Sequence, residues 1–206
     1  MNETITMQEK IAFYQSIVGV SMEIEQKTGG KYLAATHMVQ AANETGYFAD
    51  GCWRGINGWK GKMNLTGISP NGQIADFATW DEYVAAFVKV IETNGFGYPH
   101  ILDMGASGVV AQIEALGASK WNVNHYIKDG KLGGVILAVW ESDSRIVDQV
   151  INAYEVAHHQ VEEKQVKATE EKKELSESNQ VKMMIDKLKE LMDQLVAIYN
   201  ELSQTS

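Results

Sequence analysis

The chain has 206 residues, enough for one domain of typical size and an additional segment. Its apolar fraction of 45% and charged fraction of 22% are typical of a soluble globular protein. The net charge of −9 argues against a nucleic-acid-binding surface, because phosphate contacts need clustered Lys and Arg. The single cysteine, Cys52, excludes an intramolecular disulfide, and no Cys or His spacing resembles a zinc site, so we expect neither a metal nor a cofactor.

No apolar run reaches the ~20 residues that cross a bilayer, so we expect no membrane insertion. Residues 1–10 lack the basic start and the apolar core of a signal peptide. We therefore expect synthesis in the cytoplasm, wherever the protein finally acts.

Two helices are predicted near the start of the chain. Residues 7–27 carry an apolar stripe at helical spacing, and Thr6 with Glu9 fits a capping box. The next stretch, residues 32–48, begins as an apolar, alanine-rich helix that Gly46 terminates. The short connection between the two helices favours an antiparallel hairpin.

Glu44 lies at the C-terminal end of this second helix. A carboxylate gains nothing from the helix dipole there, because that end favours cations. If the apolar wall also desolvates the carboxyl group, it holds its proton to a higher pH, as a general acid requires. An exposed Glu in a last helical turn is the alternative explanation.

Glycine and aromatic residues are interleaved in residues 46–77. Long loops are uncommon in compact domains unless they form a binding site. Because aromatic faces stack on sugar rings, Trp53 and Trp59 are candidate substrate-binding residues. Packing on the core is the alternative for each ring.

Further helices are predicted for residues 79–93, where Thr79 and Glu82 fit a second capping box, for residues 107–117, which end on a glycine, and from about Leu132 onward. No stretch shows convincing strand alternation. The fold class is therefore predicted to be mainly α.

The C-terminal part differs in composition. All glycines and prolines lie at or before Gly134, so residues 135–206 are predicted to be almost continuously helical, with a turn at Ser176–Asn179 after a highly charged stretch. Apolar residues then alternate steps of four and three, which is a coiled-coil heptad seam. The seam consists of Val181, Ile185, Leu188, Met192, Leu195, Tyr199 and Leu202. Either the last helix folds back at the turn or several chains pair, and the charged stretch favours a homo-oligomer.

Residues 40–47, Gln-Ala-Ala-Asn-Glu-Thr-Gly-Tyr, with residues 64–68, Asn-Leu-Thr-Gly-Ile, resemble the glucosaminidase family of peptidoglycan hydrolases, glycoside hydrolase family 73. That family carries Gln-Ala-x-x-Glu-(Thr/Ser)-Gly-(Trp/Tyr) and later Asn-Leu-Phe-Gly-Ile. The resemblance covers about residues 8–140 and implies a lysozyme-like helical catalytic domain. Only eight residues separate Ile68 from Phe77, so the β-hairpin lobe of the family is expected to be shortened or absent.

The resemblance implies that Glu44 is the general acid and that the loop beginning at Asn64 lines the cleft. It also implies that Tyr126, and with it Trp121, contacts the substrate near the scissile bond. The chain departs from the family at Thr66, where Phe is usual, and at Phe48, where a glycine often follows the aromatic residue.

Asp76 is the one nearby acid left as a candidate general base, and solvation of the next helix start is its alternative role. A site with Glu44 alone is chemically viable, because the 2-acetamido group of the substrate can stabilise the oxocarbenium-like centre.

We therefore expect residues 1–155 to be a glucosaminidase-like catalytic domain, an endo-β-N-acetylglucosaminidase that cuts bacterial peptidoglycan. We expect residues 156–206 to be a helical segment for oligomerisation or wall attachment. Such an enzyme suits a phage lysis protein or a virion protein made in the host cytoplasm. The alternatives are a muramidase or lytic transglycosylase on the same core, and a non-catalytic, glycan-binding oligomeric assembly protein.

Overall fold

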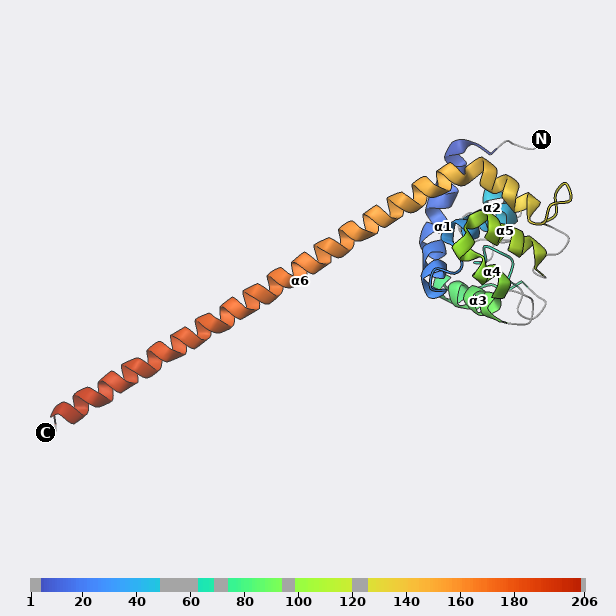
Figure 1. Ribbon diagram of the computed structural model, residues 1–206. Helices are drawn as coiled ribbons and strands as arrows, with labels where there is room; N and C mark the ends of the chain where they lie inside the picture. The colour runs from blue at the N-terminus through green and yellow to red at the C-terminus, as the bar shows by residue number, and fades with distance from the viewer. Residues whose placement is uncertain (1–4, 49–62, 69–73, 94–98, 120–125, 205–206) are drawn as a thin grey trace. The chain divides into compact units, whose positions relative to one another are not determined.

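The computed structural model describes residues 5–48, 63–68, 74–93, 99–119 and 126–204 (Figure 1). The chain divides into two compact units, Met1–Glu155 and Val156–Ser206. Over the described ranges the structure is helical and contains no strand, only an isolated bridge between Lys128 and Lys131. The mainly α class predicted from the sequence is confirmed.

The first unit is built from short helices and the beginning of a long one. Contacts join α1 to α2 and α3, α2 to α5, and α4 to both α3 and α5, around one apolar core. The elements are α1 (Met7–Lys27), α2 (Ala34–Thr45), η1 (Gly46–Phe48), α3 (Trp80–Glu92), α4 (Pro99–Asp103), η4 (Gly105–Ser107), α5 (Val109–Ala118) and α6 (Gly134–Gln204).

Helix α2 is the central element of this unit. Ten of its twelve residues are buried, and the two exceptions, Asn43 and Glu44, lie in its last turn. Alanines at four positions of α2 let the neighbouring helices approach closely. The helix therefore places one carboxyl group at the point where an otherwise buried rod reaches the surface.

The N-terminal caps of α1 and α3 show how local sequence sets the helix starts. The capping box predicted for α1 is confirmed: Thr6 Oγ1 accepts from the Glu9 backbone at 3.3 Å, and Glu9 Oε2 accepts from the Thr6 backbone at 2.7 Å. In α3, Thr79 Oγ1 accepts from the backbone of Glu82 at 3.2 Å. The carboxylate of Glu82 instead accepts from the backbone of Ala78, one residue before the cap.

Helices α1 and α2 form the predicted antiparallel hairpin. Late in α1, Ser21 Oγ lies 2.8 Å from Nδ1 of His37 near the start of α2. Early in α1, the ring of Phe13 packs edge-on against Tyr47, just after α2, with 5.4 Å between ring centroids. Opposite ends of the two helices therefore lie together.

A left-handed turn ends α2. Gly46 has φ 56° and terminates the helix, as predicted. Tyr47 and Phe48 also have positive φ, 57° and 62°, which costs an L-residue about 1–2 kcal/mol. At the position of Phe48 the family resembled above often has a glycine, the residue that adopts such a φ without strain.

One predicted helix end is wrong. Gly117 does not close α5, which continues through Ala118. The glycine serves packing instead, because a Cβ at Gly117 would overlap the backbone nitrogen of Gly133. Close approach of two backbones requires glycine for a reason that periodicity does not reveal.

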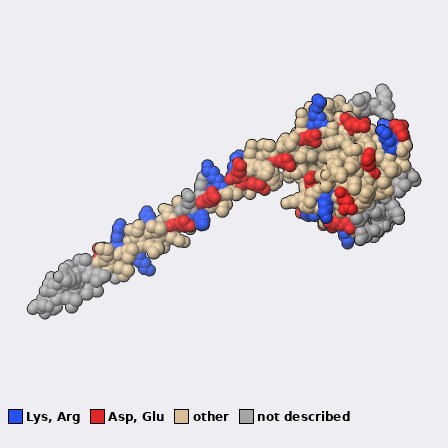
Figure 2. Space-filling view, in the orientation of Figure 1, with Lys and Arg blue, Asp and Glu red and all other residues tan. Residues whose placement is uncertain are grey.

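The turn predicted at Ser176–Asn179 is also wrong. Helix α6 is uninterrupted from Gly134 to Gln204, since Ser and Asn lower helix propensity only by tenths of a kcal/mol. The last helical segment therefore cannot fold back on the preceding part of α6 at these residues, because no turn interrupts the helix there. From Val156 to Asp193 every described side chain is exposed, and Figure 2 shows acidic and basic side chains mixed along this stretch.

None of the helices in the described ranges combines the length and the apolar character that crossing a bilayer requires.

Candidate functional site

Glu44 is held by a tyrosine from a distant part of the chain. The carboxyl group is half-buried at the end of α2, and its Oε1 accepts a hydrogen bond from the hydroxyl of Tyr126. Tyr126 itself is only 1% exposed. The buried ring of Tyr126 thus supports the Glu44 carboxyl, and its contact with a substrate, implied by the family resemblance, stays a prediction.

The electrostatics of this pair keep Tyr126 a hydrogen-bond donor. Burial raises the pKa of Tyr126 well above its ordinary value, and the charge of Glu44 and the hydrogen bond to it raise it further. The phenol therefore stays protonated at any physiological pH and always has a hydrogen to offer to the carboxylate.

The loop that contains Asn64 is closed by that side chain. Asn64 is fully buried, its Oδ1 accepts from the backbone of Ile68 at 2.9 Å, and its Nδ2 donates to the carbonyls of Ile68 and Ala75 at 3.0 and 3.1 Å. The amide group is thus engaged in shaping the loop, while its predicted role in substrate binding stays a prediction.

Asp76 lies next to this loop and is exposed. Its Oδ1 accepts a hydrogen bond from the backbone of Met63 at 3.1 Å, which ties the segment before α3 to the start of the loop. The structure therefore gives Asp76 a local structural role in addition to the candidate role of general base.

A series of hydrogen bonds between buried side chains connects the loop to helices α3, α2 and α1. Thr66 Oγ1 lies 3.0 Å from the hydroxyl of Tyr83, which lies 2.8 Å from Nε2 of His37, and Nδ1 of His37 meets Ser21. Burial lowers the pKa of His37 to about 3, so the imidazole is neutral in the core. Thr66, which stands where the family motif usually has Phe, thus connects the loop to this series of hydrogen bonds.

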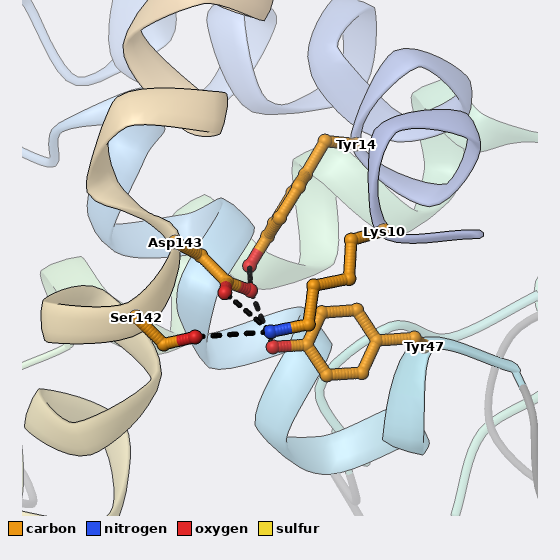
Figure 3. Close-up of polar contacts among 5 residues, drawn as sticks. All are labelled: Lys10, Tyr14, Tyr47, Ser142 and Asp143. Carbon is orange, nitrogen blue, oxygen red and sulfur yellow. Dashed lines mark hydrogen bonds and ion pairs between the residues drawn. The ribbon is translucent and has the colours of Figure 1, made fainter. Parts of the chain in front are cut away.

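A second polar cluster anchors the turn after Glu44 (Figure 3). The carboxylate of Asp143 in α6 is fully buried and accepts from Lys10 Nζ at 2.5 Å and from the Tyr14 hydroxyl at 2.8 Å. The Tyr47 hydroxyl also donates to Asp143, and the ammonium of Lys10 lies 5.1 Å from the Tyr47 ring centroid. This cluster joins α1, α6 and the strained turn that follows Glu44.

This cluster is not predicted from the sequence, although the sequence contains a signal for it. Asp143 lies on the apolar stripe of α6 between Ile136, Val147 and Val150, all of which are buried. A carboxylate in such a position needs partners, because an unpaired buried charge is strongly disfavoured. His37 and Gln40 on the buried helix α2 give the same kind of signal.

Three of the predicted aromatic site residues, Trp53, Trp59 and Trp121, lie outside the described residues. In the part of the chain that the structure describes, no three His, Cys, Asp or Glu side chains lie close enough to hold a metal ion.

No protein-family model, no curated protein and no solved structure matches this chain. The resemblance to the glucosaminidase family therefore rests on residues 40–47 and 64–68.

Proposed function

We propose that this chain is a glycosidase of bacterial peptidoglycan, an endo-β-N-acetylglucosaminidase in which Glu44 is the general acid. One observation carries the proposal: Glu44 lies where the buried helix α2 reaches the surface, and the buried phenol of Tyr126 holds one of its oxygens. A carboxyl group that is held in place by a hydrogen bond and is only partly buried can deliver a proton to a bound substrate. On this proposal the first unit is a lysozyme-like domain.

The chemistry needs one proton and one nucleophile. Glu44 protonates the glycosidic oxygen while the bond from that oxygen to C1 breaks, and the carbonyl oxygen of the substrate's 2-acetamido group attacks C1. Water then opens the resulting ring at C1 and gives a proton back to the Glu44 carboxylate. The sugar supplies the nucleophile, so no second carboxylate is required.

The environment of Asp76 favours this one-carboxylate route. Asp76 is exposed, and its Oδ1 is engaged by the backbone of Met63. A general base works best when its carboxylate is oriented by the site toward the attacking water. The contact with Met63 orients Asp76 toward its own loop instead.

The tail is proposed to make the enzyme a homo-oligomer. Val181, Leu188 and Met192 of the heptad seam are 57%, 58% and 65% exposed in the single chain. Met184 and Leu191, beside the seam, are 66% and 51% exposed and make the apolar face broader than the seam alone. Burial of such a side chain contributes about 1.5–3 kcal/mol, so association of several copies is strongly favoured. Several linked sites raise avidity for a polymeric wall.

This activity suits a phage lysis enzyme or a virion-borne protein that acts on the cell wall.

Mass spectrometry of borohydride-reduced fragments from purified peptidoglycan tests the bond specificity. Reduced N-acetylglucosamine at the new ends supports the glucosaminidase, and reduced N-acetylmuramic acid would instead show a muramidase. Anhydro ends without a reducible group would show a lytic transglycosylase. Binding to the wall without fragments would show a glycan-binding protein.

A further inference from the structure

We infer that Gln40 is a positioning residue for Glu44: it fixes the direction of the Tyr126 hydroxyl, so that Tyr126 donates to the carboxyl group and does not accept from it. The inference rests on the proposed role of Glu44 and names the residue that prepares this carboxyl for proton delivery.

Gln40 occupies the right place on α2. It lies one helical turn before Glu44 on the same face, since residues four apart are neighbours on a helix. Its side chain is fully buried. The hydroxyl of Tyr32, also fully buried, donates to Gln40 Oε1 at 2.7 Å. Because Tyr32 has a hydrogen to give, it selects the amide orientation in which the oxygen faces Tyr32 and the NH₂ group faces away.

The NH₂ group of Gln40 is inferred to face the Tyr126 oxygen, because Gln40 lies one turn before Glu44, which accepts the hydrogen bond of that hydroxyl. Nε2 of Gln40 is buried, and among the described residues it has no hydrogen-bond partner. Burial and the charge of Glu44 raise the pKa of Tyr126, and Gln40 acts in the opposite direction, as an N–H directed at the phenol oxygen does. A buried donor is rarely left without an acceptor, and we assign the Tyr126 oxygen, which is held at Glu44 one turn away, as the acceptor of Gln40.

These contacts fix the donor and the acceptor of each hydrogen bond from Tyr32 through Gln40 and Tyr126 to Glu44. A phenol oxygen that faces an N–H donor cannot turn its own hydrogen toward that donor, so the hydrogen of Tyr126 goes to Glu44 Oε1. Oε1 is then held as an acceptor, and the proton that Glu44 delivers resides on its other oxygen. Tyr32, Gln40 and Tyr126 together fix which carboxyl oxygen is the acid.

Thr36 offers a matched control. It lies one turn before Gln40 on the same face of α2 and is equally buried. Its hydroxyl has no hydrogen-bond partner within the part of the chain that the structure describes. It contacts neither Tyr126 nor Glu44 through any hydrogen bond of the described residues. Thr36→Val therefore removes a buried polar atom without changing the series of hydrogen bonds that leads from Tyr32 to Glu44.

The test is the titration of the Glu44 carboxyl carbon by NMR in the full chain, assigned by its absence in Glu44→Gln. Tyr126→Phe should raise the titration midpoint by about one pH unit, because the carboxylate loses a donor. Gln40→Leu should also raise it, because Tyr126 can then accept from the protonated acid. The double variant should match Tyr126→Phe alone, since Gln40 acts through Tyr126, and Thr36→Val should match the unmodified chain.

An unchanged midpoint in Gln40→Leu, or a double variant whose shift is the sum of the two single shifts, would overturn the inference. If Gln40→Leu does not fold, Tyr32→Phe takes its place, because it frees the amide to rotate and must raise the midpoint in the same direction. The titration needs no substrate. Wall hydrolysis that survives Glu44→Gln would overturn the proposed function, whereas the NMR result decides the role of Gln40 separately.

Discussion

The hydroxyl group of Tyr126 donates a hydrogen bond to Oε1 of Glu44 across 82 positions of the sequence. The contact ties the end of α2 to the segment that precedes α6, so the candidate acid is fixed by two parts of the first unit. The neighbouring turn is fixed in the same way, because Tyr47 donates to Asp143 of α6. Such support from rigid elements is what a proton-delivering carboxyl group requires.

Asp76→Asn should keep most of the wall-lytic activity, because on the proposed route the acetamido group of the substrate supplies the nucleophile. The initial rate of turbidity loss of purified cell walls measures it. Asp81→Asn is the control, since Asp81 is an exposed acid in the first turn of α3. Loss of a true general base costs about 10²–10⁴-fold in rate, so a loss of that size in folded Asp76→Asn would contradict the one-carboxylate route.

Asp143→Ala should destabilise the first unit by about 3 kcal/mol, because it leaves Lys10 and two tyrosine hydroxyls without their buried acceptor. Urea unfolding followed by circular dichroism measures the loss. Glu23→Gln is the control, because it breaks the Lys27–Glu23 pair, whose side chains are 44% and 32% exposed, and should cost less than about 1 kcal/mol. Equal losses in the two variants would show that the cluster at Asp143 contributes no more than a surface ion pair.

The stability of the protein should fall as the pH drops, in part because of His37. The unfolded chain binds a proton at His37 below about pH 6.5, whereas the folded chain does not until about 3, the pKa to which burial lowers this residue. The contribution of neutral His37 to the free energy of unfolding is thus complete above pH 6.5. It is lost toward pH 3, at about 1.4 kcal/mol per pH unit.

His37→Gln should make this dependence shallower by that amount, as measured by urea unfolding at a series of pH values. Thr36→Val, at another buried polar residue of α2 that does not titrate, should leave it unchanged. Parallel curves for the unmodified chain and His37→Gln would mean that the imidazole is not neutral in the core.

The elements with local signals were predictable from the sequence, and those that depend on distant partners were not. Thr6 with Glu9 marks the start of α1, and Gly46 marks the end of α2, because caps are decided within four residues. Gly117 was misread as a helix end because its partner, Gly133, lies in another segment. The turn placed at Ser176–Asn179 failed because polar residues alone do not interrupt a helix that lacks Gly and Pro.

The candidate site divides in the same way. Glu44 was found from its place after an apolar helix and from the motif around it. The hydrogen-bond partners of Glu44 and of the turn after it could not be found, because Tyr126 reaches Glu44, and Asp143 reaches Tyr47, only through the tertiary fold. The sequence shows that Asp143 and Gln40 are polar residues on apolar stripes, but it does not show their partners.

The full chain should be a dimer or a larger oligomer at micromolar concentration, and a chain that ends at Asn179 should be a monomer. Multi-angle light scattering measures both. Leu188→Asp should dissociate the oligomer, because it places a charge in the seam, whereas Lys187→Asp, its neighbour outside the seam, should not. A monomeric full chain would refute self-association of the tail.

The release of new reducing ends from purified peptidoglycan by the full chain and by Glu44→Gln tests the central claim most directly. Glu92→Gln is the control, because Glu92 is exposed at the end of α3. Loss of a general acid costs about 10²–10⁴-fold in rate. The account predicts that the unmodified chain and Glu92→Gln release reducing ends at the same rate, and that Glu44→Gln releases almost none while its melting temperature is unchanged. Activity of more than a few per cent in folded Glu44→Gln, or no release by the unmodified chain, would contradict it.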